Sequence, residues 1–290
     1  MWQQFIINGL VAGSALGLLA ASFAVIYQTA GFFHFAHASV FTLAAYIAYS
    51  GMKLLGLPCP LVIVAAVSIT AVVGWLQYSL LYGPISRRNA NRTSLLLVSL
   101  GLMVAMENSV SMVFGDEFKT LSDLPVGKGI SIGSALITPI QVVTILSSAV
   151  ALAGLGILLN YTRLGVSLRA VADDRDLAAA VGLEPVRLTG YSFAIGSALA
   201  AIAAILSALD TGLTPSMGFN ALLLAVVAVV IGGIGSIQGA LVGGLAIGMV
   251  RNLTAAIIPI AWIDALVFLF LILFLVLRPH GIMGDAPSRR

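Results

Sequence analysis

Long apolar stretches, separated by short polar segments, dominate this chain. They run continuously and do not alternate between apolar and polar positions, so the pattern favours helices over strands. Two of them, Phe35–Ala48 and Ala221–Ile231, are shorter than the roughly 20 residues that a full membrane crossing needs. We interpret these two as tilted, re-entrant or buried segments. The stretches are Phe5–Tyr27, Phe35–Ala48, Leu61–Leu81, Ser94–Phe114, Ile140–Leu159, Tyr191–Leu209, Ala221–Ile231, Ser236–Ala256 and Trp262–Leu277.

This pattern predicts an all-α, polytopic membrane helical bundle of about 8 transmembrane helices, with re-entrant or broken segments. Composition supports the prediction, because hydrophobic residues make up 60% of the chain and charged residues only 9%. Soluble domains carry roughly 25% charged residues. In lipid every backbone N–H and C=O must be paired within the protein. Without a linker or low-complexity tract, residues 1–290 are predicted to form a single membrane-spanning domain.

Lysine and arginine predict the orientation of the bundle. Ten of the fourteen cations lie in three segments, namely Gly83–Arg92, Asn160–Gly190 and the tail after Leu277. By the positive-inside rule these segments face the cytoplasm, which makes the C-terminus cytoplasmic. The loop Gly115–Thr138 has no cationic excess and is placed outside.

One cytoplasmic segment, within the loop of about 161–190, has a helical pattern of its own. Ser167 can cap a helix that runs to Val181, and Gly182 and Pro185 would end it. Small alanines on its surface would let the groove of another protein approach closely. The pattern also fits an ordinary solvated or interfacial loop helix, and the residues alone leave both interpretations open.

Glycines recur at four-residue spacing in two places. Gly9, Gly13 and Gly17 share one face of the first stretch, and a second series follows Gly235. Such spacing is typical of closely packed helices. The segment GGIGSIQG (Gly232–Gly239) is denser in glycine and predicts a broken helix, a feature that commonly lines transport pathways or hinges.

Several polar residues lie within the apolar stretches. Glu107, with Asn108 beside it, is expected to be paired, protonated or turned toward the protein interior, because a charge at this depth costs roughly 2.5–3.5 kcal/mol. Arg251 is a candidate partner. His34 and His37 share one helix face, but the sequence offers no second ligand pair, so we predict no metal site. A place at a helix end or along a pathway is favoured for both histidines.

The motifs of common enzymes are absent from the sequence. There is no GxxxxGK[ST] phosphate loop, since VGKGISIG (Val126–Gly133) lacks the spacing, and no HExxH or GxSxG motif. We therefore predict a transport subunit that is not an enzyme and cannot hydrolyse ATP by itself.

Five segments, in order along nearly the whole chain, carry a family resemblance. They are NGLVAGSALGLLAASFAVIYQTAGFFHFAHASVFTLAAY (Asn8–Tyr46), VSLGLMVAMEN (Val98–Asn108), TRLGVSLRAVADDRDLAAAVGLEPVRL (Thr162–Leu188), VVIGGIGSIQGALVGGL (Val229–Leu245) and LRPHGIMG (Leu277–Gly284). Together they resemble the LivH-type permease subunits of branched-chain amino acid ABC transporters. His34 stands where the family usually has Asn, while Ser39 and Ala44 each replace a Gly. These departures bear on the substrate more than on the fold.

The resemblance implies a bacterial inner-membrane importer subunit. Its partners would be a second permease subunit of LivM type, two ATPase subunits of LivG and LivF type that bind ATP and Mg, a periplasmic substrate-binding protein and membrane lipid, with no nucleic acid. The implied ATPase-coupling residues are Leu168, Arg169, Ala170, Asp173, Asp174, Leu177, Ala178 and Gly182. The candidate pathway or gating residues are His34, His37, Glu107, Asn108, Gly232, Gly233, Gly235, Ser236 and Gly239.

The leading hypothesis is a pathway for branched-chain or other hydrophobic amino acids. A permease of the same architecture for urea or short amides is the close alternative. A stand-alone secondary transporter or channel, with Glu107 and His37 as its proton or ion groups, is the alternative of another class. The coupling loop distinguishes these classes, because only the ABC permease needs it to contact an ATPase.

Overall fold

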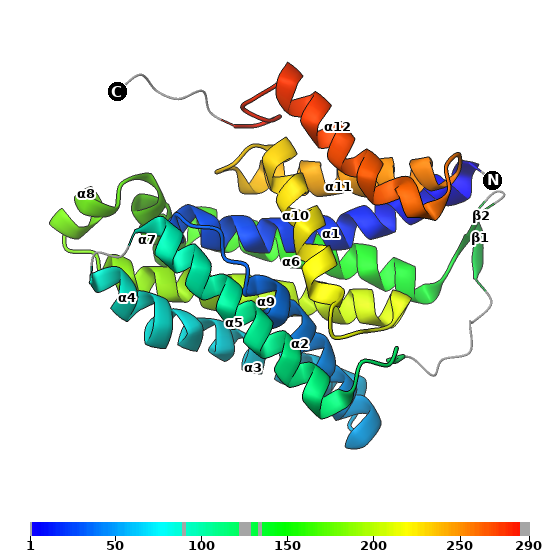
Figure 1. Ribbon diagram of the computed structural model, residues 1–290, viewed down its shortest axis with the longest axis horizontal. Helices are drawn as coiled ribbons and strands as arrows, with labels where there is room; N and C mark the ends of the chain where they lie inside the picture. The colour runs from blue at the N-terminus through cyan, green and yellow to red at the C-terminus, as the bar shows by residue number, and fades with distance from the viewer. Residues whose placement is uncertain (1, 89–90, 122–128, 133–134, 285–290) are drawn as a thin grey trace.

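The computed structural model describes residues 2–88, 91–121, 129–132 and 135–284, and almost all of them are helical (Figure 1). The helices are α1 (Trp2–Ala30), α2 (His37–Tyr49), α3 (Cys59–Leu76), α4 (Gly83–Arg87), α5 (Arg92–Phe114), α6 (Pro139–Tyr161), α7 (Arg163–Asp173), α8 (Arg175–Ala180), α9 (Pro185–Thr211), α10 (Met217–Gly232), α11 (Ile237–Ala255) and α12 (Ile263–Leu277). Two π-helical turns, η1 (Ser50–Leu54) and η2 (Gln77–Tyr82), extend α2 and α3, and a 3₁₀ turn, η3 (Ile260–Trp262), precedes α12. A short antiparallel hairpin joins β1 (Ile130–Ile132) to β2 (Ala135–Ile137).

The helices confirm the predicted polytopic membrane bundle. Five are long and apolar enough to cross a membrane: α1, the continuous segment Cys59–Arg87, α5, α6 and α9. The pair α10 and α11 passes the same test together but bends by 118° at its break. The predicted number of about eight also counted the stretches that form α2 and α12, which are only 13 and 15 residues long.

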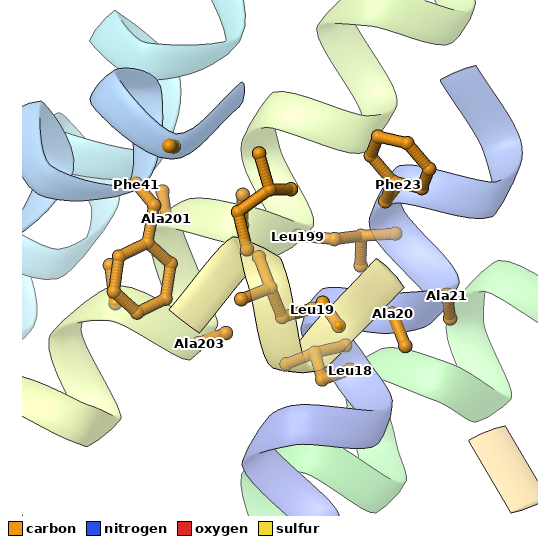
Figure 2. Close-up of a cluster of buried hydrophobic side chains, with 14 of the residues drawn as sticks. Leu18, Leu19, Ala20, Ala21, Phe23, Phe41, Leu199, Ala201 and Ala203 are labelled. Carbon is orange, nitrogen blue, oxygen red and sulfur yellow. The ribbon is translucent and has the colours of Figure 1, made fainter. Parts of the chain in front are cut away.

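Helices α1 and α9 form the centre of the bundle. In their most apolar windows 83% and 67% of the residues are buried, whereas the windows of α5 and α6 are only 17% and 22% buried. Figure 2 shows the side chains at this centre, where Leu19 and Phe23 of α1 lie close to Leu199 of α9. The outer helices α5 and α6 therefore present most of their surface to lipid or to other subunits.

Glycine allows α1 and α11 to pack backbone against backbone. A Cβ atom on Gly244 would overlap the Cα atom of Gly17, and one on Gly248 would overlap the Cα atom of Gly13. A Cβ atom on Gly13 would in turn lie 3.0 Å from the Cα atom of Leu245. The glycine spacing in both helices is thus used for close helix packing, as the sequence predicted.

The bundle has two ends of different character (Figure 1). At one end the side-chain amide of Gln4 donates to the Leu136 carbonyl at 2.9 Å and accepts from its N–H at 2.8 Å, which ties the start of α1 to β2. At the other end lie α4, α7 and α8. The cationic segments predicted to be cytoplasmic gather at this second end. Arg289 and Arg290 of the tail lie outside the described residues, and so do residues 122–128 of the loop predicted to face the outside.

The glycine contact between α1 and α11 can be tested with a matched pair of alanines. We expect Gly244→Ala to lower the unfolding free energy by about 1–3 kcal/mol, because the obstructing atoms are backbone and cannot rotate away. Gly154→Ala on α6 is the control, since a Cβ atom there meets nothing within 4 Å. It should preserve or raise stability by removing a helical glycine. Thermal melting of the purified chain, followed by fluorescence-detected size exclusion, measures both; equal losses would contradict the packing role.

Candidate functional site

The segment predicted to be one coupling helix from Ser167 to Val181 is in fact two helices. Thr162 caps α7, because its hydroxyl accepts a hydrogen bond from the Gly165 N–H at 3.0 Å. Asp174 ends α7 and caps α8 by accepting from the N–H groups of Asp176 and Leu177 at 3.0 and 2.9 Å. Ser167 is not a cap, since its hydroxyl donates to the Arg163 carbonyl inside α7. An aspartate can interrupt a helix by satisfying the next N–H groups itself.

The coupling residues predicted from sequence divide between two faces of α7 and α8. Leu168 and Ala178 are buried against the bundle, so neither side chain lies on a free surface. Arg169, Asp173, Leu177 and Gly182 are exposed, while Ala170 and Asp174 are partly buried. Val181, one turn after Leu177, is also strongly exposed. Leu177 of α8 and Val181 directly after this helix therefore form an exposed apolar pair, and α7 adds an exposed cation and an exposed anion.

Specific contacts join this segment to the bundle. The Arg175 guanidinium donates to the Tyr78 hydroxyl at 3.1 Å, and Tyr78 lies in the π-helical turn η2. A Cβ atom on Gly165 would overlap the backbone of α6 at Leu158, so α7 packs directly on the helix before it. Gly182, with φ of 88°, ends α8 in the left-handed conformation, and the Leu183 N–H bonds the Ala178 carbonyl at 3.1 Å. A force applied to α7 or α8 would thus reach α3, α6 and α9.

The glycine-rich segment Gly232–Gly239 forms the break between α10 and α11, as predicted. Gly233 and Gly235 have φ of 111° and 101°, values that L side chains rarely adopt. The Ser236 hydroxyl caps α11 by accepting from the Gly239 N–H at 2.9 Å. Gly232 and Gly239 lie so close that a Cβ atom on either would overlap the other's backbone. Glycine is therefore needed at both positions for the tight turn between α10 and α11.

The tail of the chain binds this break. The Ile282 N–H donates to the Ile231 carbonyl at 2.9 Å, and the Met283 N–H donates to the Gly232 carbonyl at 2.8 Å. A Cβ atom on Gly233 would overlap the Gly284 backbone. Two motifs about fifty residues apart in sequence, GGIGSIQG and LRPHGIMG, thus form one structural unit. The sequence does not predict this pairing, because each motif can be interpreted as a turn that needs no partner segment.

His34 and His37 are fully buried. The Nε2 atom of His37 and the Ser22 hydroxyl form a hydrogen bond of 2.9 Å, which joins α2 to α1. The His34 ring lies among aromatic rings, with its centroid 4.8 Å from that of Phe193 and 5.3 Å from that of Tyr82. Among the described residues no third His, Cys, Asp or Glu joins the two histidines.

Glu107 and Arg251, the charged residues considered as a pair from the sequence, do not form an ion pair with each other. Arg251 forms an ion pair of 3.3 Å with Asp264 of α12, and not with Glu107. Glu107 is partly buried and makes no hydrogen bond or ion pair with the described residues, while Asn108 is exposed and bonds only the Val104 carbonyl one turn earlier. Both therefore lie on a side of α5 that the rest of the chain leaves largely uncovered.

Two cavities in the described part of the chain lie away from Glu107 and Asn108. One opens among α1, α9, α10 and α11, and the other among α1, α6 and α11. None of the nine candidate pathway residues lines either cavity. Their pathway role stays a prediction, and a pathway along Glu107 would have to be completed by another chain.

A family comparison covers nearly the whole sequence. Residues 5–277 match the model of a family described as "Branched-chain amino acid transport system / permease component". The chain belongs to this permease family. The matched residues include the α7–α8 loop and the α10–α11 break, while the tail segment after Leu277 lies beyond the match.

Individual relatives agree with this assignment. The chain is 33% identical to the high-affinity branched-chain amino acid permease protein LivH of Salmonella typhimurium, over 97% of this chain and 95% of LivH. It is 31% identical to the permease protein BraD of Pseudomonas aeruginosa, over 98% and 96% of the two chains. A solved structure titled "PsaBC from Streptococcus pneumoniae in complex with Fab" has the same fold, with a TM-score of 0.52 and 13% identity over 93% of this chain and 91% of the other. The protein is thus a multi-pass permease of a transport family, a family that is not known for enzymatic activity.

The contact between the permease's tail and its α10–α11 break can be tested by hydrogen exchange. We expect Gly233→Ala to displace the tail, so that the amides of Ile282 and Met283 exchange at least about tenfold faster, as broken hydrogen bonds require. Gly235→Ala is the matched control, because its φ is also positive but a Cβ atom there meets nothing within 4 Å. Hydrogen-exchange mass spectrometry of the tail peptide measures both variants. The comparison separates the effect of steric overlap with Gly284 from the effect of backbone strain at a positive φ. Equal protection in both variants would refute the contact.

Proposed function

We propose that this permease is one membrane subunit of an ABC importer for branched-chain or other hydrophobic amino acids. The similarity to LivH and BraD, full-length at 33% and 31% identity, carries the proposal. The complete importer would add a second permease subunit of LivM type, two ATPase subunits of LivG and LivF type that bind ATP and Mg, and a periplasmic substrate-binding protein. The cationic end of the bundle and the C-terminus would face the cytoplasm of a bacterial inner membrane.

The α7–α8 segment is the proposed binding surface for the ATPase subunit. Leu177 and Val181 form an exposed apolar pair at 62% and 71% exposure, which an apolar groove would cover. Arg169 and Asp173, both exposed on α7, would fix the orientation by charged contacts, since complementary charges determine register at an interface. The bond between Arg175 and Tyr78 and the seat of Gly165 on α6 support transmission, because ATP-driven closure could then rock the attached helices as rigid bodies.

The uncovered side of α5 is the proposed seat of the second permease subunit. A Cβ atom on Gly101 meets nothing within 4 Å, and Ala105 and Asn108 are exposed on the same side. Small residues along one helix face permit close approach of another helix. A carboxylate such as Glu107 is costly toward lipid, so a subunit interface that holds a pathway is the favoured environment.

Charge reversal on α7 tests the proposed coupling. We expect Asp173→Arg and Arg169→Glu each to lower ATP-driven leucine uptake by about tenfold or more, because like charges would meet in the ATPase groove. Uptake is measured with the reconstituted complex in proteoliposomes, and copurification of the ATPase subunits is scored alongside. The double variant Arg169→Asp with Asp173→Arg keeps the net charge but exchanges the positions of the two charges. It therefore distinguishes an effect of charge position from an effect of total charge.

The matched control reverses an exposed acid at the opposite end of the bundle. Glu117→Arg adds the same charge as Asp173→Arg. Glu117 lies two residues before Lys119, which pairs with Leu213 after the end of α9, whereas α7 and α8 precede the start of this 27-residue helix, so uptake should stay near the wild-type rate. Intact uptake with ATPase subunits still bound in the Asp173→Arg and Arg169→Glu variants would exclude the coupling role. Uptake that needs a proton gradient instead of ATP, and that Glu107→Gln abolishes, would favour a secondary transporter.

A further inference from the structure

A cavity opens at the end of the bundle opposite α7 and α8. It has a volume of about 380 Å³, within the range of small-molecule sites. Its walls come from α1, α2, α6, α9, α10 and α11, and Phe118 from the segment after α5 also lines it. This is the end that the positive-inside rule places outside, where an importer receives its cargo.

Two charged side chains and one amide are among the polar groups that line this cavity. They are Asp210 near the end of α9, Asn220 in the first turn of α10, and Arg251 on α11. Neither Asp210 nor Asn220 makes a side-chain hydrogen bond or ion pair with the described residues. Arg251 is held by Asp264 at 3.3 Å, but only one of its terminal nitrogens is used in that pair. A carboxylate and a guanidinium with free bonding capacity therefore face one space.

The rest of the wall carries the hydroxyl groups of Thr144, Ser207, Thr211 and Thr214 together with an apolar surface. Leu16 and Leu19 of α1, Phe41 of α2 and Leu224 of α10 line the apolar part. Leu19 and Phe41 belong to the apolar cluster of Figure 2. The cavity thus combines an anion, a cation and an apolar surface within the size of one small molecule.

We propose that this cavity binds a small zwitterion with an apolar side chain. The Arg251 guanidinium would take the α-carboxylate, Asp210 the α-ammonium, and the wall formed by Leu16, Leu19, Phe41 and Leu224 the side chain. The inference rests on the proposed function and deepens it, because it assigns the cargo a subsite within this subunit. Asp264 is a positioning residue that orients the guanidinium.

The two charges make the zwitterion a better occupant than a purely apolar molecule. A lipid tail would cover the leucines but leave Asp210 without a partner and the second terminal nitrogen of Arg251 unused. An acid without an ammonium group would leave Asp210 unpaired, and an amine without a carboxylate would leave Arg251 underused. A leucine-like molecule satisfies both groups at once.

Binding of three related probes tests the assignment. The assembled importer in lipid nanodiscs, without ATP, is titrated with leucine, with 4-methylpentanoate, which lacks the ammonium group, and with 3-methylbutylamine, which lacks the carboxylate. We expect Asp210→Asn to weaken leucine and the amine by about 10- to 100-fold and to leave the acid unchanged. Arg251→Gln should weaken leucine and the acid and leave the amine unchanged. Glu117→Gln, an exposed acid outside the cavity, is the control and should alter none of the three.

Loss of folding is controlled by a second variant. Arg251→Gln leaves the Asp264 carboxylate without its ion-pair partner. The double variant Arg251→Gln with Asp264→Asn removes both charges and should show the same probe selectivity as Arg251→Gln alone. Equal weakening of all probes, or no weakening, in the two single variants would overturn the subsite. If ATP-driven leucine uptake stays intact in both, the proposed function stands and only the subsite fails. If the wild-type complex takes up no amino acid, the proposed function itself fails.

Discussion

The close contact between the backbones of α1 and α11 is the constraint on which the rest of the bundle depends. Gly13 and Gly17 on one helix, with Gly244 and Gly248 on the other, leave no room for a Cβ atom between them. Lipid supplies no hydrophobic force between helices, so this contact gains its stability from dispersion over a large, closely matched surface. It holds the hairpin of α10 and α11 against the central helix, and the cavity lined by Arg251 is formed on one side of that junction.

The break between α10 and α11 and the chain's tail extend this constraint to one end of the molecule. Gln28, near the end of α1, donates to the Gly235 carbonyl at 2.8 Å, while Ile282 and Met283 bond the last turn of α10. Through these bonds, α1, the hairpin and α12 meet at the end where α7 and α8 also lie (Figure 1). A motion imposed there would be passed to the whole central layer, because packed elements shift as units.

Much of the fold could be predicted from the order of apolar residues. Continuous apolar runs predicted helices, glycines at four-residue spacing predicted close packing, and GGIGSIQG predicted a break, and the structure confirms each. Helix boundaries within the α7–α8 loop could not be predicted, because Thr162 and Asp174 compete with Ser167 as caps and only the packing of Gly165 on α6 favours the first. The environment of His34 could not be predicted either, since its aromatic neighbours Tyr82 and Phe193 come from segments distant in sequence.

The sequence by itself determined that this protein is a helical membrane protein and that its cations concentrate in a few loops, because these follow from composition and from the length of the apolar stretches. Its family followed from segments that resemble known permeases. Only the tertiary structure decided which polar groups meet. Arg251 pairs with Asp264 and shares a cavity with Asp210, while Glu107 does not line that cavity. Partnership between side chains depends on how helices rotate about their axes, and that rotation is fixed by glycine contacts between distant segments, to which the local pattern of apolar residues is insensitive.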